Sequence, residues 1–113
     1  MQIRLNHYHW NKWLRDIRML NNWYVYIIRC SDNSLYTGIT TDVSRRLLEH
    51  QSQGNKTAKY LRGKSPLNLV FQLEVKNRSS ALKIEQKIKQ LSKSEKEKII
   101  IQQKIDSTLL VCL

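Results

Sequence analysis

Two short apolar runs separated by a polar stretch predict a β-hairpin in the first half of the chain. The runs are YVYIIR (24–29) and LYTGIT (35–40), with SDNS (31–34) between them. Tyrosine and β-branched residues fill both runs, as is typical of strands. Gly38 interrupts the second run. Because glycine weakens a strand, it indicates a place where another group approaches the backbone closely.

The length of the hairpin loop decides whether Tyr26 and Tyr36 share a face of the sheet. Side chains alternate between the two faces, and directly opposed residues point the same way. A two-residue turn would separate the tyrosines, whereas a three-residue loop at 32–34 would oppose Tyr26 to Thr40 and keep both tyrosines together. We predict the odd-length loop, or a bulge with the same effect. Either Asn33 or Ser34 then adopts a left-handed conformation, which asparagine tolerates better than serine.

The segment TTDVSRRLLEHQSQ (40–53) predicts a helix directly after the hairpin. Val43 and Leu47 share its buried stripe, since they lie one turn apart. Arg46 and His50 fall beside that stripe, also one turn apart, and Glu49 faces outward.

The second half of the chain reads as one strand followed by two helices. The run LNLVFQLEV (67–75) alternates, with its apolar residues at the odd positions from 67 to 75 on one face. Residues 79–91 are amphipathic at helical spacing, and a second helix over 92–105 opens with the capping-box pattern at 94–97. Residues 54–66 form a basic loop or a short helix. The order β-β-α-β-α-α predicts an α+β fold in which helices flank a three-stranded antiparallel sheet.

A chain of 113 residues predicts one domain with a single modest core. Its formal net charge of +11, from 20 Lys and Arg against 9 Asp and Glu, is typical of a nucleic-acid-binding protein. An acidic membrane surface or a structural ribosomal role would also suit that charge. Four residues of the basic loop either follow a phosphate backbone or are ordinary surface charge: Lys56, Lys59, Arg62 and Lys64.

Two cysteines are too few for a disulfide framework or a four-ligand zinc site, so we expect a reduced, cytoplasmic protein. No apolar run approaches the roughly 20 residues of a membrane-spanning helix. We divide the chain into an N-terminal extension (1–22), a domain (23–105) and a tail (106–113). Apolar residues at helical spacing over 10–17 make the extension a short amphipathic helix, or else the start is mis-called ahead of Met19.

Glu85 is the carboxylate most suited to carry chemistry. It lies at the edge of the apolar stripe of its helix, where a carboxylate is costly unless it has a partner such as a metal ion. The alternative is an ordinary ion pair with Lys89, one turn later on the same helix.

These features together resemble the GIY-YIG nuclease superfamily, over residues 23 to about 100. YVY (24–26) stands for its first triplet and YTG (36–38) for its second, with tyrosine in place of glycine and threonine in place of isoleucine. The likeness is greatest to its small stand-alone bacterial members. Five residues of the family pattern are intact and in order: Tyr26, Tyr36, Arg46, His50 and Glu85.

The resemblance implies phosphodiester hydrolysis with one divalent metal ion, Mg²⁺ or Mn²⁺. Glu85 would ligate the metal, and Arg46 would hold the phosphate and counter its growing charge. Tyr26 or Tyr36 would orient the water, one of them acting as general base if nearby positive charge lowers its pKa. Gly38 between the two tyrosines would leave room for the phosphate. His50 is the alternative base or a proton relay.

The leading interpretation is a small metal-dependent endonuclease acting on DNA, with RNA as the other substrate. One alternative is a nucleic-acid-binding module of the same fold that does not cleave. Another is a nuclease subunit that needs a protein partner, which would bind through residues 10–20 or the isoleucine run at 99–101.

Overall fold

A three-stranded antiparallel sheet with helices on both faces forms the described part of the chain, residues 22–107 of a computed structural model. This confirms the predicted α+β class and element order, and one short 3₁₀ turn, η2, falls within the basic loop. In chain order the elements are β1 (Trp23–Arg29), β2 (Leu35–Thr40), α2 (Val43–Gln51), η2 (Lys59–Leu61), β3 (Asn68–Val75), α3 (Arg78–Gln90) and α4 (Lys93–Gln102).

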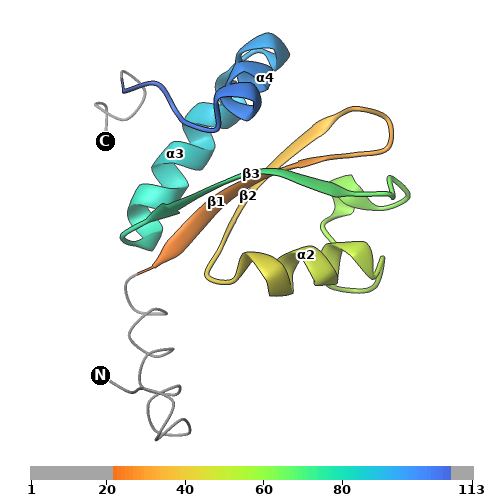
Figure 1. Cartoon of the computed structure of the whole chain (residues 1–113). Helices are drawn as coiled ribbons and strands as arrows, with labels where there is room; N and C mark the ends of the chain where they lie inside the picture. The colour runs from red at the N-terminus through yellow and green to blue at the C-terminus, as the bar shows by residue number, and fades with distance from the viewer. Residues whose placement is uncertain (1–21, 108–113) are drawn as a thin grey trace, which may run out of the picture.

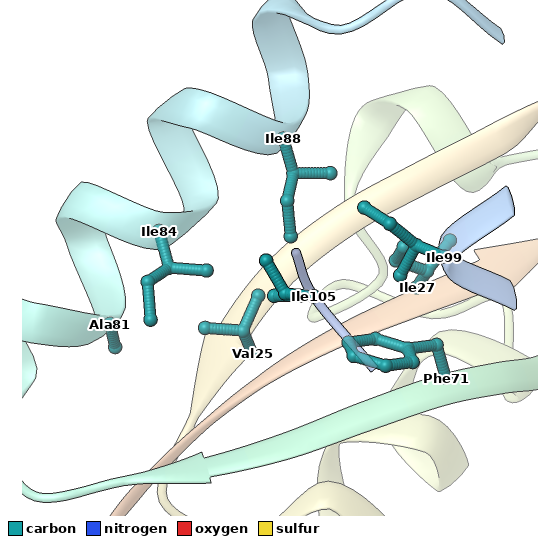
Figure 2. Packing of buried hydrophobic residues seen from close by; sticks show 8 residues of the cluster. All are labelled: Val25, Ile27, Phe71, Ala81, Ile84, Ile88, Ile99 and Ile105. Atoms are coloured by element: carbon teal, nitrogen blue, oxygen red, sulfur yellow. The ribbon is translucent and has the colours of Figure 1, made fainter. Parts of the chain in front are cut away.

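The sheet has the order β2-β1-β3, so β1 is its central strand and both other strands are edges. Helices α3 and α4 lie on one side of the sheet and α2 on the other (Figure 1). The core on the α3 side consists of Val25, Ile27, Phe71, Ala81, Ile84, Ile88, Ile99 and Ile105 (Figure 2). A smaller core on the α2 side consists of Tyr26, Ile28, Cys30, Leu61 and Leu67.

Alternation along β1 supplies both cores from a single strand. Val25 and Ile27 are fully buried towards α3, and Tyr26 and Ile28 are equally buried on the α2 side. Apolar residues on both faces suit a central strand, because neither face is left to water.

The apolar stripe of β3 does not stay on one face, contrary to the sequence-based prediction. Phe71 belongs to the core on the α3 side, whereas Leu67 and Leu69 pack into the core on the α2 side. The cause is a register shift of one residue, because Ile27 pairs with Phe71 while Ile28 pairs with Leu69. One extra residue in a strand moves the residues beyond it to the other face of the sheet. The same strand therefore serves both cores.

The hairpin loop has the predicted odd length, but its register differs from the prediction by two residues. Tyr26 pairs with Gly38 rather than Thr40, and Ile28 pairs with Tyr36. The loop therefore spans 31–33, and the Cys30 amide donates to the Ser34 carbonyl at 2.9 Å. Both tyrosines still share the α2 face, as predicted.

Side chains within the loop explain the shift. Asp32 Oδ1 accepts from the Ser34 amide at 3.0 Å and from its hydroxyl at 2.6 Å. Asn33 has a φ of 70°, which is the left-handed conformation predicted for an asparagine in this loop. These local contacts close the loop one position earlier than a loop at 32–34 would allow.

Gly38 provides the predicted close approach, but the approaching group is a tyrosine ring and not a phosphate. A Cβ atom at Gly38 would lie 2.5 Å from Oη of Tyr26 and 2.7 Å from its Cζ. The aromatic side chain thus lies across the glycine backbone of the neighbouring strand. We correct the expectation that Gly38 leaves this space open for substrate.

The N-terminal cap of helix α4 lies two residues before the predicted one, and the helix is fastened to the hairpin. Its capping box joins Ser92 and Glu95, in place of the predicted pair at 94–97. Glu97 is thereby free to accept two hydrogen bonds from the Arg29 guanidinium, at 2.6 and 2.7 Å. Lys93 Nζ also donates to the carbonyl of Asn33 at 2.5 Å. The bidentate pair of Arg29 with Glu97 holds the end of β1 against α4.

The isoleucine run at 99–101 is not a continuous exposed surface. Ile99 is buried in the core and Ile100 packs against that core, so only Ile101 is exposed, at 80%. A partner contact through this run therefore stays a prediction that rests on one side chain.

Several predictions fall outside the described residues. These are the amphipathic helix at 10–17, the alternative start, the partner surface at 10–20 and the end of the tail. The division into extension, domain and tail stays a prediction. Between residues 22 and 107, no helix has the length and apolar character needed to cross a bilayer.

We expect Gly38→Ala to lower the free energy of unfolding by about 1–3 kcal/mol, because its methyl group would overlap the Tyr26 ring. Gly54→Ala is the matched control, since a Cβ there meets only the Ser52 hydroxyl, at 3.4 Å. Urea denaturation of both variants measures the difference. Equal stabilities would show that the tyrosine does not lie over Gly38.

Candidate functional site

A buried hydrogen bond between β1 and α2 lies at the centre of the site. Oη of Tyr26 is 2.9 Å from Nε2 of His50. Tyr26 is 2% exposed and His50 is 0% exposed. His50 belongs to the last turn of α2, whose N-terminus is capped by the side chain of Asp42. The spacing that predicted His50 beside the buried stripe is therefore confirmed.

The partners of the His50 ring assign its tautomer. The Ala58 amide donates to Nδ1 at 3.4 Å, so Nδ1 acts as the acceptor. Nε2 then carries the proton and donates to the Tyr26 oxygen. Burial lowers the pKa of His50 to about 4, with the Arg46 charge adding to the effect. His50 is consequently neutral at pH 7.

Burial raises the pKa of Tyr26 well above its ordinary value. The neighbouring Tyr36 adds to the rise, and the Arg46 guanidinium acts against it. At neutral pH the phenol is thus protonated, and Arg46 is the one described charge that favours its ionised form. Tyr26 alone is a weak general base.

Aromatic rings extend from this hydrogen bond towards the surface. The Tyr36 ring lies 6.3 Å from Tyr26 between centroids and meets His50 edge-on at 5.6 Å. Tyr36 also stacks with Tyr60, with 5.9 Å between the ring centroids and 29° between the ring planes. Tyr60 belongs to η2 in the basic loop and was not predicted as a site residue.

Arg46 has two acceptors close to the aromatic rings. Its Nη1 donates to Glu49 Oε1 at 2.8 Å and to the Lys56 carbonyl at 2.7 Å. Glu49 also accepts from Arg45 at 3.0 Å, and the Arg46 guanidinium holds the pKa of Glu49 below its ordinary value. The prediction that Glu49 faces outward is wrong, because its side chain is only 17% exposed. Glu49 is a second residue that sequence reasoning missed.

The basic loop contacts the site through two of its four predicted residues. Lys56 contributes the carbonyl that holds Arg46, and Nζ of Lys64 lies 3.6 Å above the Tyr60 ring centroid. Arg62 folds back onto carbonyls of its own loop at 3.4 Å, and Lys59 is exposed beside Tyr60. Phosphate binding by these four residues stays a prediction.

Glu85 is buried on α3, but it has no direct contact with the other four predicted residues in the part of the chain described. It is 8% exposed, and its Oε2 lies 3.3 Å from Nζ of Lys89. The ion pair that was the alternative interpretation is thus present. Helix α3 packs against the face of β1 and β2 opposite to Tyr26 and Tyr36. A surface shared by all five residues stays a prediction.

The donor set limits how a metal ion would be held. Within residues 22–107 no group of three or more histidine, cysteine, aspartate or glutamate side chains could enclose an ion. Mg²⁺ commonly uses only one or two protein carboxylates and completes its coordination with water and substrate phosphate. A single buried carboxylate such as Glu85 fits that mode of binding.

Comparisons with known proteins cover the segment of the chain that carries this site. Residues 22–99 match the family model described as GIY-YIG catalytic domain, a span that includes all five predicted residues. A similar protein, UPF0213 protein YhbQ of Salmonella arizonae, is 53% identical over 91 residues, which cover 80% of this chain and 89% of that protein. A UPF0213 protein of Yersinia pestis is 56% identical over 81 residues, covering 72% and 83% respectively.

A solved structure is also similar to this chain. The solution NMR structure of a UPF0213 protein from Bacillus halodurans is 39% identical to it. The match covers 81% of this chain and 96% of that one, with a TM-score of 0.49.

The lowered pKa of His50 predicts a pH-dependent stability. Because the unfolded state takes up a proton near pH 6.5 and the folded state near pH 4, the free energy of unfolding falls as the pH drops between these values. The slope is at most about 1.4 kcal/mol per pH unit. Urea denaturation between pH 7 and pH 5 measures it.

The control for this slope is His50→Gln, which has no titrating group at that position. The variant should lose the slope between pH 7 and pH 5 whatever its stability at pH 7. If it keeps the wild-type slope, His50 is not the titrating group.

Proposed function

The chain belongs to the GIY-YIG family, and from this premise we propose that it is an endonuclease that hydrolyses phosphodiester bonds in DNA with one divalent metal ion. One observation carries the proposal. Tyr26, Tyr36, Arg46 and His50 come from three different elements and gather on one face of the sheet. Structural stability alone does not require two tyrosines, a neutral histidine and an arginine in one place.

Arg46 is the group that would bind the scissile phosphate. It is already desolvated in part and is held by Glu49 and the Lys56 carbonyl, so little ordering remains to be done when a phosphate arrives. A preorganised guanidinium stabilises the charge that grows on the phosphoryl oxygens during attack. Glu49 would act as a positioning residue for that guanidinium.

The family resemblance offers Tyr26, Tyr36 and His50 as the general base, and of these Tyr36 is best placed to contact water. His50 is fully buried and its Nε2 is occupied by Tyr26, while Tyr26 is buried and has a raised pKa. Tyr36 is half-buried and contacts both rings. We therefore assign to Tyr36 the orientation of the attacking water, with the Tyr26–His50 pair positioning Tyr36.

Glu85 would hold the divalent ion, Mg²⁺ or Mn²⁺. When bound, the ion supplies positive charge that neutralises the phosphate and the leaving oxygen. Side chains from the two faces of a sheet can meet only around its edge. Tyr36 lies on β2, which is an edge strand, and α3 packs against the same strand from behind. Glu85 would therefore act on the same substrate as the four clustered residues, Tyr26, Tyr36, Arg46 and His50, at the β2 edge of the sheet.

The second candidate function is a nucleic-acid-binding module that does not cleave. It is favoured by the ion pair of Glu85 with Lys89 and by the absence of Glu85 from the contacts of the cluster. RNA remains the other substrate, since nothing in the cluster distinguishes the two sugars.

We expect Glu85→Gln to abolish cleavage of DNA in Mg²⁺ or Mn²⁺ and to leave DNA binding within a few-fold of wild type. The change removes a metal ligand and no phosphate contact. Lys89→Gln is the matched control, because it breaks the ion pair and keeps the carboxylate. Gel assays of cleavage and fluorescence anisotropy of binding provide the two readouts, on duplex, branched and single-stranded DNA.

Two outcomes would contradict the proposal. If Glu85→Gln cuts as fast as wild type, Glu85 is not the metal ligand. If affinity for DNA does not fall between low and moderate salt, the basic loop does not contact phosphates and the nucleic-acid substrate is wrong.

Tyr36→Phe should lower kcat by about 100-fold or more with little change in KM, because the hydroxyl acts on water and not on substrate binding. Tyr24→Phe is the control, since it removes a hydroxyl from the same face of the sheet. Steady-state cleavage of a fluorescent oligonucleotide measures both constants. Wild-type kcat in the Tyr36 variant would rule out its role with water.

A further inference from the structure

The Tyr60 ring continues the aromatic row of the site out to the surface. It is 46% exposed, although its stacking partner Tyr36 is half-buried and His50 beyond it is fully buried. An aromatic ring exposed beside basic side chains is the kind of surface on which unpaired bases stack. We propose that Tyr60 is a stacking platform for an unpaired nucleobase, so that the protein selects strands with an unpaired nucleotide next to the bond it cuts.

The position of Tyr60 relative to Arg46 supports this inference, which rests on the proposed function. The loop that carries Tyr60 also supplies the Lys56 carbonyl that holds Arg46. One loop would therefore present Tyr60 to a base and also hold Arg46, on α2, for a phosphate. Because a base and its own phosphate are neighbours in a strand, a single nucleotide can engage both. In a paired duplex the faces of that base are covered by its neighbours, so stacking on Tyr60 needs an unpaired or unstacked base.

Lys64 now occupies the place where the base would stack. Its ammonium lies 3.6 Å above the Tyr60 ring centroid and 3.7 Å from a carboxylate oxygen of Asp32. Both contacts are weak, since a cation–π contact at an exposed site and a surface ion pair each contribute less than stacking of a base on an aromatic ring. Once displaced from the Tyr60 ring, the Lys64 ammonium could bind a phosphate of the same strand.

The test measures binding and not cleavage. In the full chain with Glu85→Gln, Tyr60→Leu is compared with Tyr60→Phe by fluorescence anisotropy. The ligands are single strands of about 12 nucleotides, a length within the usual site size. They are oligothymidylate, oligouridylate and an abasic strand of the same length and charge.

We expect Tyr60→Leu to weaken binding of oligothymidylate or oligouridylate by roughly 5- to 150-fold and binding of the abasic strand by less than 2-fold. Tyr60→Phe should stay within about 2-fold of the parent on all three strands, because the ring is kept. Ile101→Ala, which removes exposed apolar surface on the other side of the sheet, should change none of them.

Two results would overturn the inference. If Tyr60→Leu binds the base-containing strands as tightly as the parent, no base stacks on this ring. If it weakens the abasic strand equally, Tyr60 only supports Tyr36 and the loop. Neither result depends on cleavage. A wild-type protein that binds strands through Tyr60 but never cuts them would remove the proposed function and the choice of a bond to cut, and would leave only base stacking on Tyr60.

Discussion

The arrangement of the site depends on the buried hydrogen bond between Tyr26 and His50. A phenol and an imidazole deprived of water would each cost about 1–3 kcal/mol if left unpaired. Their contact at 2.9 Å removes that cost and fixes α2 against the central strand. Arg46, one turn before His50 on the same helix, and Tyr36, which rests on the imidazole edge, take their places from it. The low dielectric that strengthens this bond also keeps the histidine neutral and the tyrosine protonated.

Most of this arrangement could be predicted from local rules. Two tyrosines ten residues apart share a face only if the loop between their strands is odd in length, and the left-handed preference of asparagine favours such a loop. Helical spacing placed Arg46 and His50 together. The exact register of the hairpin was not predictable in the same way, because the Asp32 side chain selects one of two odd loops through hydrogen bonds to Ser34.

The parts that sequence reasoning missed depend on contacts between distant segments. Periodicity says nothing about where a loop lies, so Tyr60 in the basic loop gave no signal that it stacks on Tyr36. Glu49 was assigned to solvent because helical spacing alone does not include the basic loop. The Lys56 carbonyl of that loop and Glu49 bind the same nitrogen of Arg46, so the Glu49 side chain is covered. The stripe of β3 appeared regular, and only pairing with β1 shows the extra residue that divides it. For Glu85, helical spacing placed the carboxylate at the edge of the apolar stripe and offered the ion pair with Lys89 as the alternative, and that ion pair is present.

The bidentate pair of Arg29 with Glu97 has a consequence for how the protein is made. The four clustered residues and the basic loop are all synthesised by residue 66, whereas the Arg29 side chain at the end of β1 pairs with a carboxylate 68 residues further along the chain. The sheet also lacks part of its core until Ile99 and Ile105 have been added. During translation from the N-terminus, the hairpin is therefore synthesised before Glu97 can fasten it to α4. A chain that stops before Glu97 would carry all four clustered residues but would lack the ion pair that holds the end of β1 against α4.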